Sequence, residues 1–399
     1  MKKQCNMRNL FRILPVAIAL TAMTACSTTD DSSEAIQGTA KSITFEGKAQ
    51  VDGATTTRGY YSDPGSITTD FAAYKWLNDD KIKVMLANTA TPAFLANEFW
   101  DASVSASADG TSANIGWTKD LTIAASTTYR QLLVSAPSST STIDNTGQST
   151  KRVTYSLPAT TTDAATNVEV IPYTQTGNSN MDHLKPYYFI YSSQDITSDA
   201  DGKLPKTTLS FNFIPTIMRF AVGNLTGQDI KVNSVEMVFD QVATWGFSPF
   251  RTSCGVSFER GNGTSVSSGA TSNDKIGGMK VSTSNAATIA NKASARFYGL
   301  IPPYTSQAIQ NKGQNTYTFY VNYTDASSHT YYVAATIDAL DLPDKEKVNE
   351  TDSYYYFKTD YCYTFKLIVK DQLLTVEAMA PTTNPFGTGW ADDEEMTDK

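Results

Sequence analysis

Residues 361–378 read YCYTFKLIVKDQLLTVEA, and this stretch decides the fold. Its apolar side chains recur at every second position, at Tyr361, Tyr363, Phe365, Leu367 and Val369. A period of two places these side chains on one face of an extended chain, which is typical of a β-strand with one buried face. The pattern returns at Leu374 and Val376, so the stretch predicts a β-hairpin.

The same alternation recurs along the chain. It is strong in residues 209–213, 218–222, 235–239, 317–323 and 331–337, and weaker near 43–45, 82–86, 132–134 and 168–170. The segment 135–167 is rich in Ser, Thr and Ala, and we interpret it as either a long surface loop or a decorated hairpin. No amphipathic helix longer than about three turns is convincing after the N-terminal segment.

Length and composition agree with strands. The chain has 399 residues, with 21 Tyr and 18 Phe, and such usage favours strands joined by turns. So long a chain exceeds what one hydrophobic core usually supports, which indicates either two domains or one large sandwich with long insertions, and we favour two domains. We therefore predict an all-β fold of two tandem antiparallel β-sandwich domains, residues 59–225 and 226–399, divided at the turn GNLTGQD, residues 223–229.

The N-terminus has the layout of an export signal. Four basic residues, Lys2, Lys3, Arg8 and Arg12, precede an apolar stretch at residues 13–23 that is too short to span a membrane. The run LTAMTAC, residues 20–26, resembles the lipobox of bacterial lipoproteins. That resemblance implies a signal peptide at residues 1–25 and a lipid on Cys26; the alternative is a plain signal peptide with an incidental cysteine.

A polar tether follows, and then the first strand. Residues 26–58 are predicted to hold the lipidated tether and one β-strand, with Ile43 and Phe45 on its apolar face. Val51 extends that face if the chain bulges near Gly47. The strand ends in a Gly/Thr-rich loop that contains Arg58.

Charge argues against one class of partner. Removal of the four basic residues of the signal changes the net charge from -8 to -12. An acidic protein repels phosphate backbones, so we do not expect nucleic acid as a partner.

Motifs for catalysis or metal binding are few. The chain has only two histidines, His183 and His329, and no nucleotide-binding or nucleophile motif, so we expect no enzyme, no metal and no cofactor. Residues 195–203 resemble a calcium loop only in part and are better explained as a turn. Cys254 and Cys362 form either a disulfide or two separate buried thiols.

Several segments together resemble the fimbrillin family, the surface lipoproteins that build type V pili. The similar segments run in order through the chain: TTTRGYY (55–61), WLNDDKIKVML (76–86), IGWTKD (115–120), YRQLLVSAP (129–137), LSFNFIPTIMRFAVGNL (209–225), IKVNSVEMVF (230–239) and the hairpin at the C-terminal end. One departure is FNFIP, residues 211–215, where the family often has a histidine.

The resemblance implies a function and a mechanism. Such proteins are structural subunits or adhesins of a pilus, anchored in the outer membrane and found in the fimbrium after maturation. A protease cuts after an arginine, here Arg58, and removes the first strand, here the one containing Ile43, Phe45 and Val51. A strand from another pilin subunit then takes its place, which is β-augmentation. Implied partners are other pilin subunits, the outer membrane and ligands on host or bacterial surfaces.

Two alternatives remain at this point. The first is an outer-membrane surface lipoprotein that binds glycans, which requires exposed coplanar rings among the aromatic residues, including Trp76, Trp100, Trp117, Trp245 and Trp390. The second is a secreted hydrolase, which requires two facing carboxylates about 5 to 10 Å apart in a cleft. No sequence feature points to such a pair.

Overall fold

A computed structural model describes residues 41–51, 75–110, 112–240, 250–261, 263–268, 276–285, 288–305, 316–342, 345–347, 353–357, 359 and 361–378. The chain divides into two units, Met1–Gly38 and Thr39–Lys399, and the first lies outside the described residues. The predictions for Cys26 and Arg58 also fall outside them.

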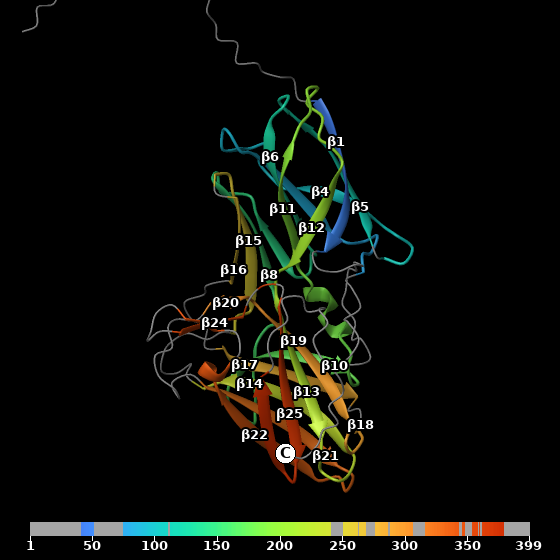
Figure 1. The fold of residues 1–399 in the computed structure, drawn as a ribbon, viewed down its shortest axis with the longest axis vertical. Helices are drawn as coiled ribbons and strands as arrows, with labels where there is room; N and C mark the ends of the chain where they lie inside the picture. The colour runs from blue at the N-terminus through green and yellow to red at the C-terminus, as the bar shows by residue number, and fades with distance from the viewer. Residues whose placement is uncertain are drawn as a thin grey trace, which may run out of the picture. The chain divides into compact units, whose positions relative to one another are not determined.

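Eight strands form the first group of paired strands. They are β1 (Lys41–Val51), β2 (Ile82–Asn88), β3 (Ala93–Phe94), β4 (Trp100–Ala106), β5 (Ala113–Leu121), β6 (Thr128–Ser135), β11 (Ile190–Thr197) and β12 (Thr207–Phe213). Their order is β3-β2-β4-β5-β1-β12-β11-β6, and β6 also pairs with β2. Figure 1 labels β1, β4, β5, β6, β11 and β12 of this group. The β2–β4 and β11–β12 pairings are short, so they join two layers, β3-β2-β6-β11 and β4-β5-β1-β12, at their edges.

A second sandwich is built from two further sheets. One has the order β22-β21-β14-β17-β10-β9 with β18 paired to β14, and the other has the order β19-β13-β25-β26. Their bounds are β9 (Thr161–Thr162), β10 (Glu169–Thr176), β13 (Thr216–Asn224), β14 (Ile230–Phe239), β17 (Ile276–Asn285), β18 (Thr288–Ile289), β19 (Ser294–Ile301), β21 (Thr316–Asp325), β22 (Thr330–Asp338), β25 (Cys362–Lys370) and β26 (Leu373–Ala378). The sheets meet through buried aromatic rings, with the Phe319 and Phe365 centroids 4.7 Å apart.

Two smaller sheets and two short 3₁₀ helices complete the described elements. The sheets are β16 (Gly263–Ser268), β15 (Ser253–Glu259), β8 (Thr150–Ser156) and β7 (Ser141–Asp144) in that order, and β20 (Tyr304–Thr305), β24 (Ser353–Phe357) and β23 (Lys345–Lys347). The helices are η1 (Asp182–Tyr187) and η2 (Ala339–Asp341). In the described ranges no helix has the length and apolar character needed to cross a membrane.

The all-β prediction is confirmed, and so is the hairpin that opened the sequence analysis. β25 and β26 pair antiparallel, with Phe365 opposite Ala378 and Lys370 opposite Leu373. The sheets are mixed rather than purely antiparallel, because β1–β12, β10–β17 and β13–β25 are parallel pairs. Parallel partners lie far apart in sequence, so a pattern read along the chain does not reveal them.

The segment 135–167 contains a hairpin. β7 and β8 pair antiparallel, with Ile143 opposite Val153, and the short strand β9 follows. Strand pairs also cross residue 225, because β8 pairs with β15 and β10 pairs with β17. The division into domains at that residue stays a prediction.

Candidate functional site

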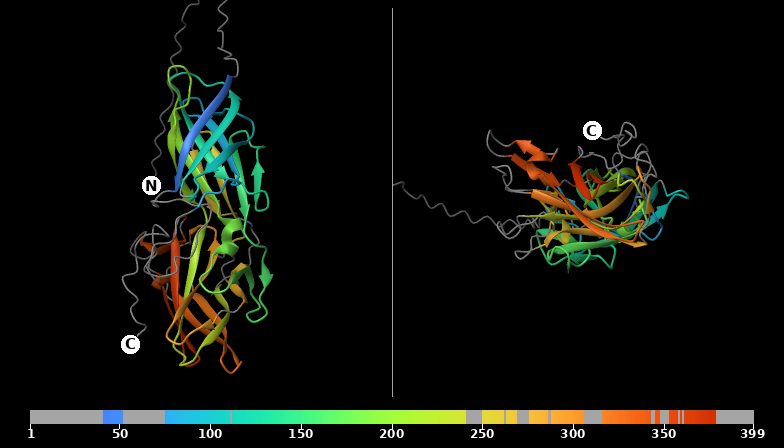
Figure 2. Two further views of the ribbon diagram at one scale, coloured as in Figure 1. Left: turned by 90° about the vertical axis from the view of Figure 1, so that its right-hand side faces the viewer. Right: turned by 90° about the horizontal axis from the view of Figure 1, so that it is seen from below.

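The first strand of the described chain is a central strand, not an edge. β1 pairs antiparallel with β5 from Lys41↔Leu121 to Ala49↔Ala113. Its last five residues also pair with β12, in parallel, from Gly47↔Thr207 to Val51↔Phe211. Figure 2 shows β1 in blue, running beside the strands of this sandwich. The backbone of residues 47–49 therefore has a paired strand on both sides.

One face of β1 is part of the hydrophobic core. Phe45 and Ala49 are fully buried, and Ile43 is half-buried against the same core. The Phe45 ring stacks on Trp117 of β5 with centroids 5.6 Å apart and planes 18° apart. Trp117 in turn meets Trp100 of β4 edge-on, at 5.3 Å. The alternation of Ile43 and Phe45 inward is thus as the sequence predicts.

Gly47 lets a side chain from β12 fill the face between Phe45 and Ala49. A Cβ at this position would lie 2.8 Å from Cδ1 of Leu209, which is itself fully buried. The pairing through Gly47 has no register shift on either side, so the bulge considered near this residue is absent. Val51 lies opposite Phe211 by backbone register, and its side chain is outside the description.

The other face of β1 is polar. The hydroxyl groups of Thr44 and Thr118 lie 3.3 Å apart across the β1–β5 pair, and Glu46 forms an ion pair with Lys206. These groups are exposed, and exposed pairs contribute little to stability. The free energy that holds β1 therefore comes from its buried face and its backbone hydrogen bonds.

Loss of β1 would change the sandwich in two ways. β5 and β12 would each present an unpaired backbone edge, and the core would lose the side chains of Phe45 and Ala49. An open edge beside an apolar face is a template for another extended segment. Sequence reasoning placed Phe45 correctly but missed Trp117 and Leu209 as its neighbours, because alternation identifies a face without its partner strand.

The remaining candidate residues have structural contacts. His183 Nε2 lies 2.9 Å from the carbonyl oxygen of Tyr298, and burial lowers the pKa of this histidine. His329 closes a turn by donating its backbone N–H to Asp325, at 2.8 Å. Asp199 accepts the backbone N–H groups of Asp201 and Lys203, as expected for an Asp-rich turn.

Cysteines and tryptophans belong to the core where they are described. Cys254 and Cys362 are separate buried thiols, so the disulfide alternative is wrong. Trp76, Trp100 and Trp117 are buried, and Trp245 and Trp390 lie outside the described residues.

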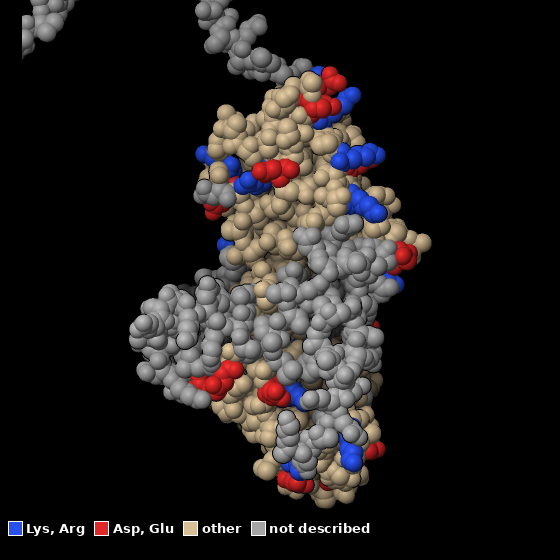
Figure 3. Space-filling model, viewed as in Figure 1, with Lys and Arg blue, Asp and Glu red and all other residues tan. Residues whose placement is uncertain are grey.

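On the face shown in Figure 3, acidic and basic side chains of the described residues lie close to one another. In the described residues no group of three His, Cys, Asp or Glu could hold a metal ion.

Comparisons with known proteins found similar structures only. No protein-family model matches the chain, and no curated protein sequence matches it. A putative cell adhesion protein from Bacteroides ovatus is 12% identical with a TM-score of 0.40, over 86% of this chain and 97% of that chain. The tip fimbrial protein Mfa3 from Porphyromonas gingivalis, with a C-terminal truncation, is 8% identical with a TM-score of 0.36, over 85% and 99%. The fimbrial anchor protein Mfa2 from the same organism is 8% identical with a TM-score of 0.33, over 84% and 95%.

Proposed function

We propose that this chain is a structural subunit or adhesin of a bacterial surface pilus, exported as a lipoprotein and assembled by donor-strand exchange. The observation that carries the proposal is the position of β1, a central strand with one face in the core at the N-terminal end of the described chain. Maturation cuts after Arg58, which follows β1 in sequence, so the cut separates that strand from all others covalently. The lipid on Cys26 holds the precursor at the outer membrane until then.

The free energy of exchange comes from the same contacts that hold β1. Burial of one large apolar side chain stabilises a fold by about 1.5 to 3 kcal/mol, and β1 places Phe45 fully in the core. A donor strand with apolar residues at alternate positions recovers this contribution and pairs with β5 and β12. A subunit whose β1 position is empty is less stable, which drives it to accept a strand from a neighbour.

The test is a limited digestion with an arginine-specific protease, followed by sequencing of the new N-termini and measurement of oligomer size. We expect one early cut after Arg58 and then a ladder of oligomers. The matched control is Arg58→Lys, which keeps the charge and removes the protease site; this variant should stay uncut at residue 58 and monomeric.

A competing peptide tests whether the oligomers form through the β1 position. A synthetic peptide of residues 41–51 refills the β1 position and should suppress the ladder of the cut protein. The same peptide with Phe45→Asp should not. A protein that is cut after Arg58 and remains a stable monomer, or a ladder that the peptide leaves unchanged, contradicts donor-strand exchange through the β1 position.

A further inference from the structure

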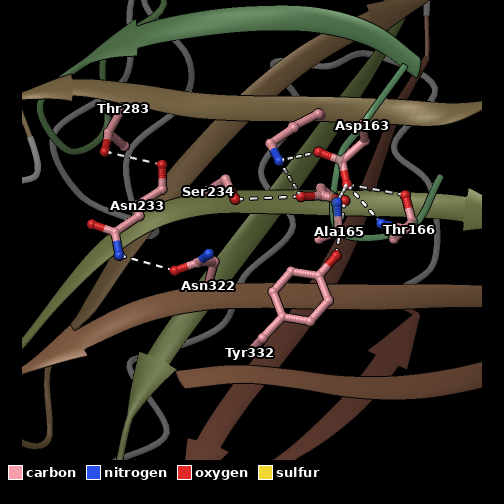
Figure 4. Close-up of polar contacts among 10 residues, drawn as sticks. Asp163, Ala165, Thr166, Asn233, Ser234, Thr283, Asn322 and Tyr332 are labelled. Atoms are coloured by element: carbon pink, nitrogen blue, oxygen red, sulfur yellow. Dashed lines mark hydrogen bonds and ion pairs between the residues drawn. The ribbon is translucent and has the colours of Figure 1, made fainter. Parts of the chain in front are cut away.

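A lysine and two acidic residues meet on one face of the sheet that contains β10, β14 and β17. Lys280 of β17 lies directly opposite Glu236 of β14 in antiparallel register, and its Nζ is 2.6 Å from Glu236 Oε1. The same Nζ contacts Oδ2 of Asp163, in the turn between β9 and β10. One ammonium group therefore bridges two carboxylates (Figure 4).

This group is largely shielded from water. The Glu236 side chain is 0% exposed and that of Asp163 is 6% exposed, while that of Lys280 is 23% exposed. Tyr332 of β22 donates its hydroxyl to Glu236 Oε2 at 3.1 Å, and its ring stacks on Tyr320 at 5.0 Å. Glu236 thus lies beneath an aromatic cover with both oxygens engaged.

The two oxygens of Asp163 have different surroundings. Oδ1 accepts the backbone N–H groups of Ala165 and Thr166, each at 2.9 Å, and the Thr166 hydroxyl at 3.1 Å. Oδ2 faces the Lys280 amine. Fixed backbone donors on one carboxyl oxygen are the arrangement that stabilises an oxyanion when a nucleophile attacks the carboxyl carbon. The nucleophile in contact with this carboxyl group is Lys280.

We propose that Lys280 and Asp163 condense into an intramolecular isopeptide bond, with Glu236 as the proton carrier. The Lys280 Nζ gives a proton to Glu236, Glu236 passes that proton to Oδ2 of Asp163, and the neutral amine attacks Cγ of the resulting carboxylic acid, so that negative charge develops on Oδ1 among its three donors. The Nζ–Cγ bond forms and the Cγ–Oδ2 bond breaks. Oδ2 leaves as water with two protons from the original ammonium, carried through Glu236. The step is a condensation without oxidant or reductant, and it replaces an ion pair by a neutral amide.

The reaction needs a base besides Lys280 and Asp163, because of the charges that these two residues carry at the start. Burial raises the pKa of Asp163, but the hydrogen bonds from Lys280 and Thr166 outweigh it and hold that pKa below its usual value. Burial lowers the pKa of Lys280, but its two carboxylate partners raise it above its usual value. The pair therefore starts as ammonium and carboxylate, and the amine becomes a nucleophile only when another base takes its proton. Glu236 is in contact with that amine.

The bond would link positions 117 residues apart. It would join the turn before β10 covalently to β17, whose other neighbour is β14. A subunit that bears tension along a polymer gains from such a link, because β10 and β17 could no longer be pulled apart in the way that hydrogen-bonded strands can.

Intact mass spectrometry of the purified full chain tests the proposal. We expect the wild-type protein to be lighter by one water molecule than the Lys280→Arg variant, after allowance for the substituted residue. Proteolysis should yield a branched peptide that joins Asp163 to Lys280. Asp163→Asn changes the leaving group, so that variant should be lighter by one ammonia molecule instead. Glu236→Gln should lose most of the cross-link.

A second ion pair supplies the matched control. Lys83 and Asp101 lie 2.8 Å apart on the surface, with Asp101 77% exposed. Lys83→Arg should change the mass by the substitution alone. A wild-type mass that retains the water, with residues 163 and 280 recovered in separate peptides, overturns the proposal. Such a result would not affect the proposal of strand exchange at the β1 position. That proposal is tested by the cleavage site and the oligomer size, whereas the isopeptide bond is tested by the mass and the cross-linked peptide.

Discussion

Among the described acidic residues, Asp80 is the one whose charge most clearly opposes folding. Burial raises the pKa of this carboxyl from 3.8 to about 6, the backbone N–H of Leu77 opposes the rise, and Asp79 adds to it. A raised pKa means that the folded state binds the proton more tightly than the unfolded state. The stabilisation is complete below the ordinary pKa, and it is lost as pH rises through the folded-state value.

We therefore expect Asp80→Asn to be more stable than the wild-type protein above about pH 6, by on the order of 2 kcal/mol. The amide keeps an acceptor for the Leu77 N–H, which lies 3.0 Å from Asp80 Oδ2. Urea unfolding at a series of pH values measures the difference. A difference between the two proteins that does not change between about pH 4 and pH 6 contradicts the raised pKa.

Cys254 and Cys362 should be chemically inert in the folded protein. Burial raises the pKa of Cys254 to about 12, and burial also raises the pKa of Cys362. The thiolate is the reactive form of cysteine, so both residues should resist alkylation at neutral pH and react after unfolding in urea. Peptide mapping after labelling checks this. Rapid labelling of the native protein, or a peptide in which the two residues are disulfide-linked, would show that the thiols are not separately buried.

At the scale of elements, the function proposed here depends on β1. The largest side chain that β1 places in the core is the ring of Phe45. Phe45→Ala should lower the free energy of unfolding of the uncut protein by about 3 to 5 kcal/mol, because it removes the stacking contact with Trp117 and leaves a cavity. Thr44→Ala, on the polar face, should change it by no more than about 0.5 kcal/mol. Equal effects of the two substitutions would mean that β1 does not contribute to the core in solution.

Sequence patterning predicts elements of this fold well where a strand has one apolar face. The hairpin at β25 and β26 and the inward face of β1 at Phe45 follow directly from alternation. The position of Glu236 does not. Alternation in residues 235–239 places Glu236 on the face opposite Val235 and Met237, but the residue is fully buried because the Asp163 turn and Tyr332 cover it. When a residue is buried by segments distant in sequence, the alternation of its own strand does not reveal that burial.

At the scale of the whole chain, pairings between distant segments escaped prediction. Hairpin turns reveal that neighbouring strands pair, but nothing near β1 indicates that it meets β12, or near β13 that it meets β25. The sheet order therefore had to come from the structure. The strand order also determines what the cut proposed after Arg58 would do. Removal of an edge strand would expose one new backbone edge, whereas removal of β1 would expose two, on β5 and on β12.

The parallel strand pairs also determine when parts of the fold can form during synthesis of the chain. As the chain emerges from a ribosome, residues 47–51 cannot pair with β12 until residues 207–211 have followed. Residues 217–224 likewise cannot pair with their parallel partner until residues 362–369 have followed. Closing such long loops is slow, and folding rates fall as contacts become more distant in sequence. The sheet that contains β13 and β25 therefore cannot be completed until nearly all of the described chain has been synthesised.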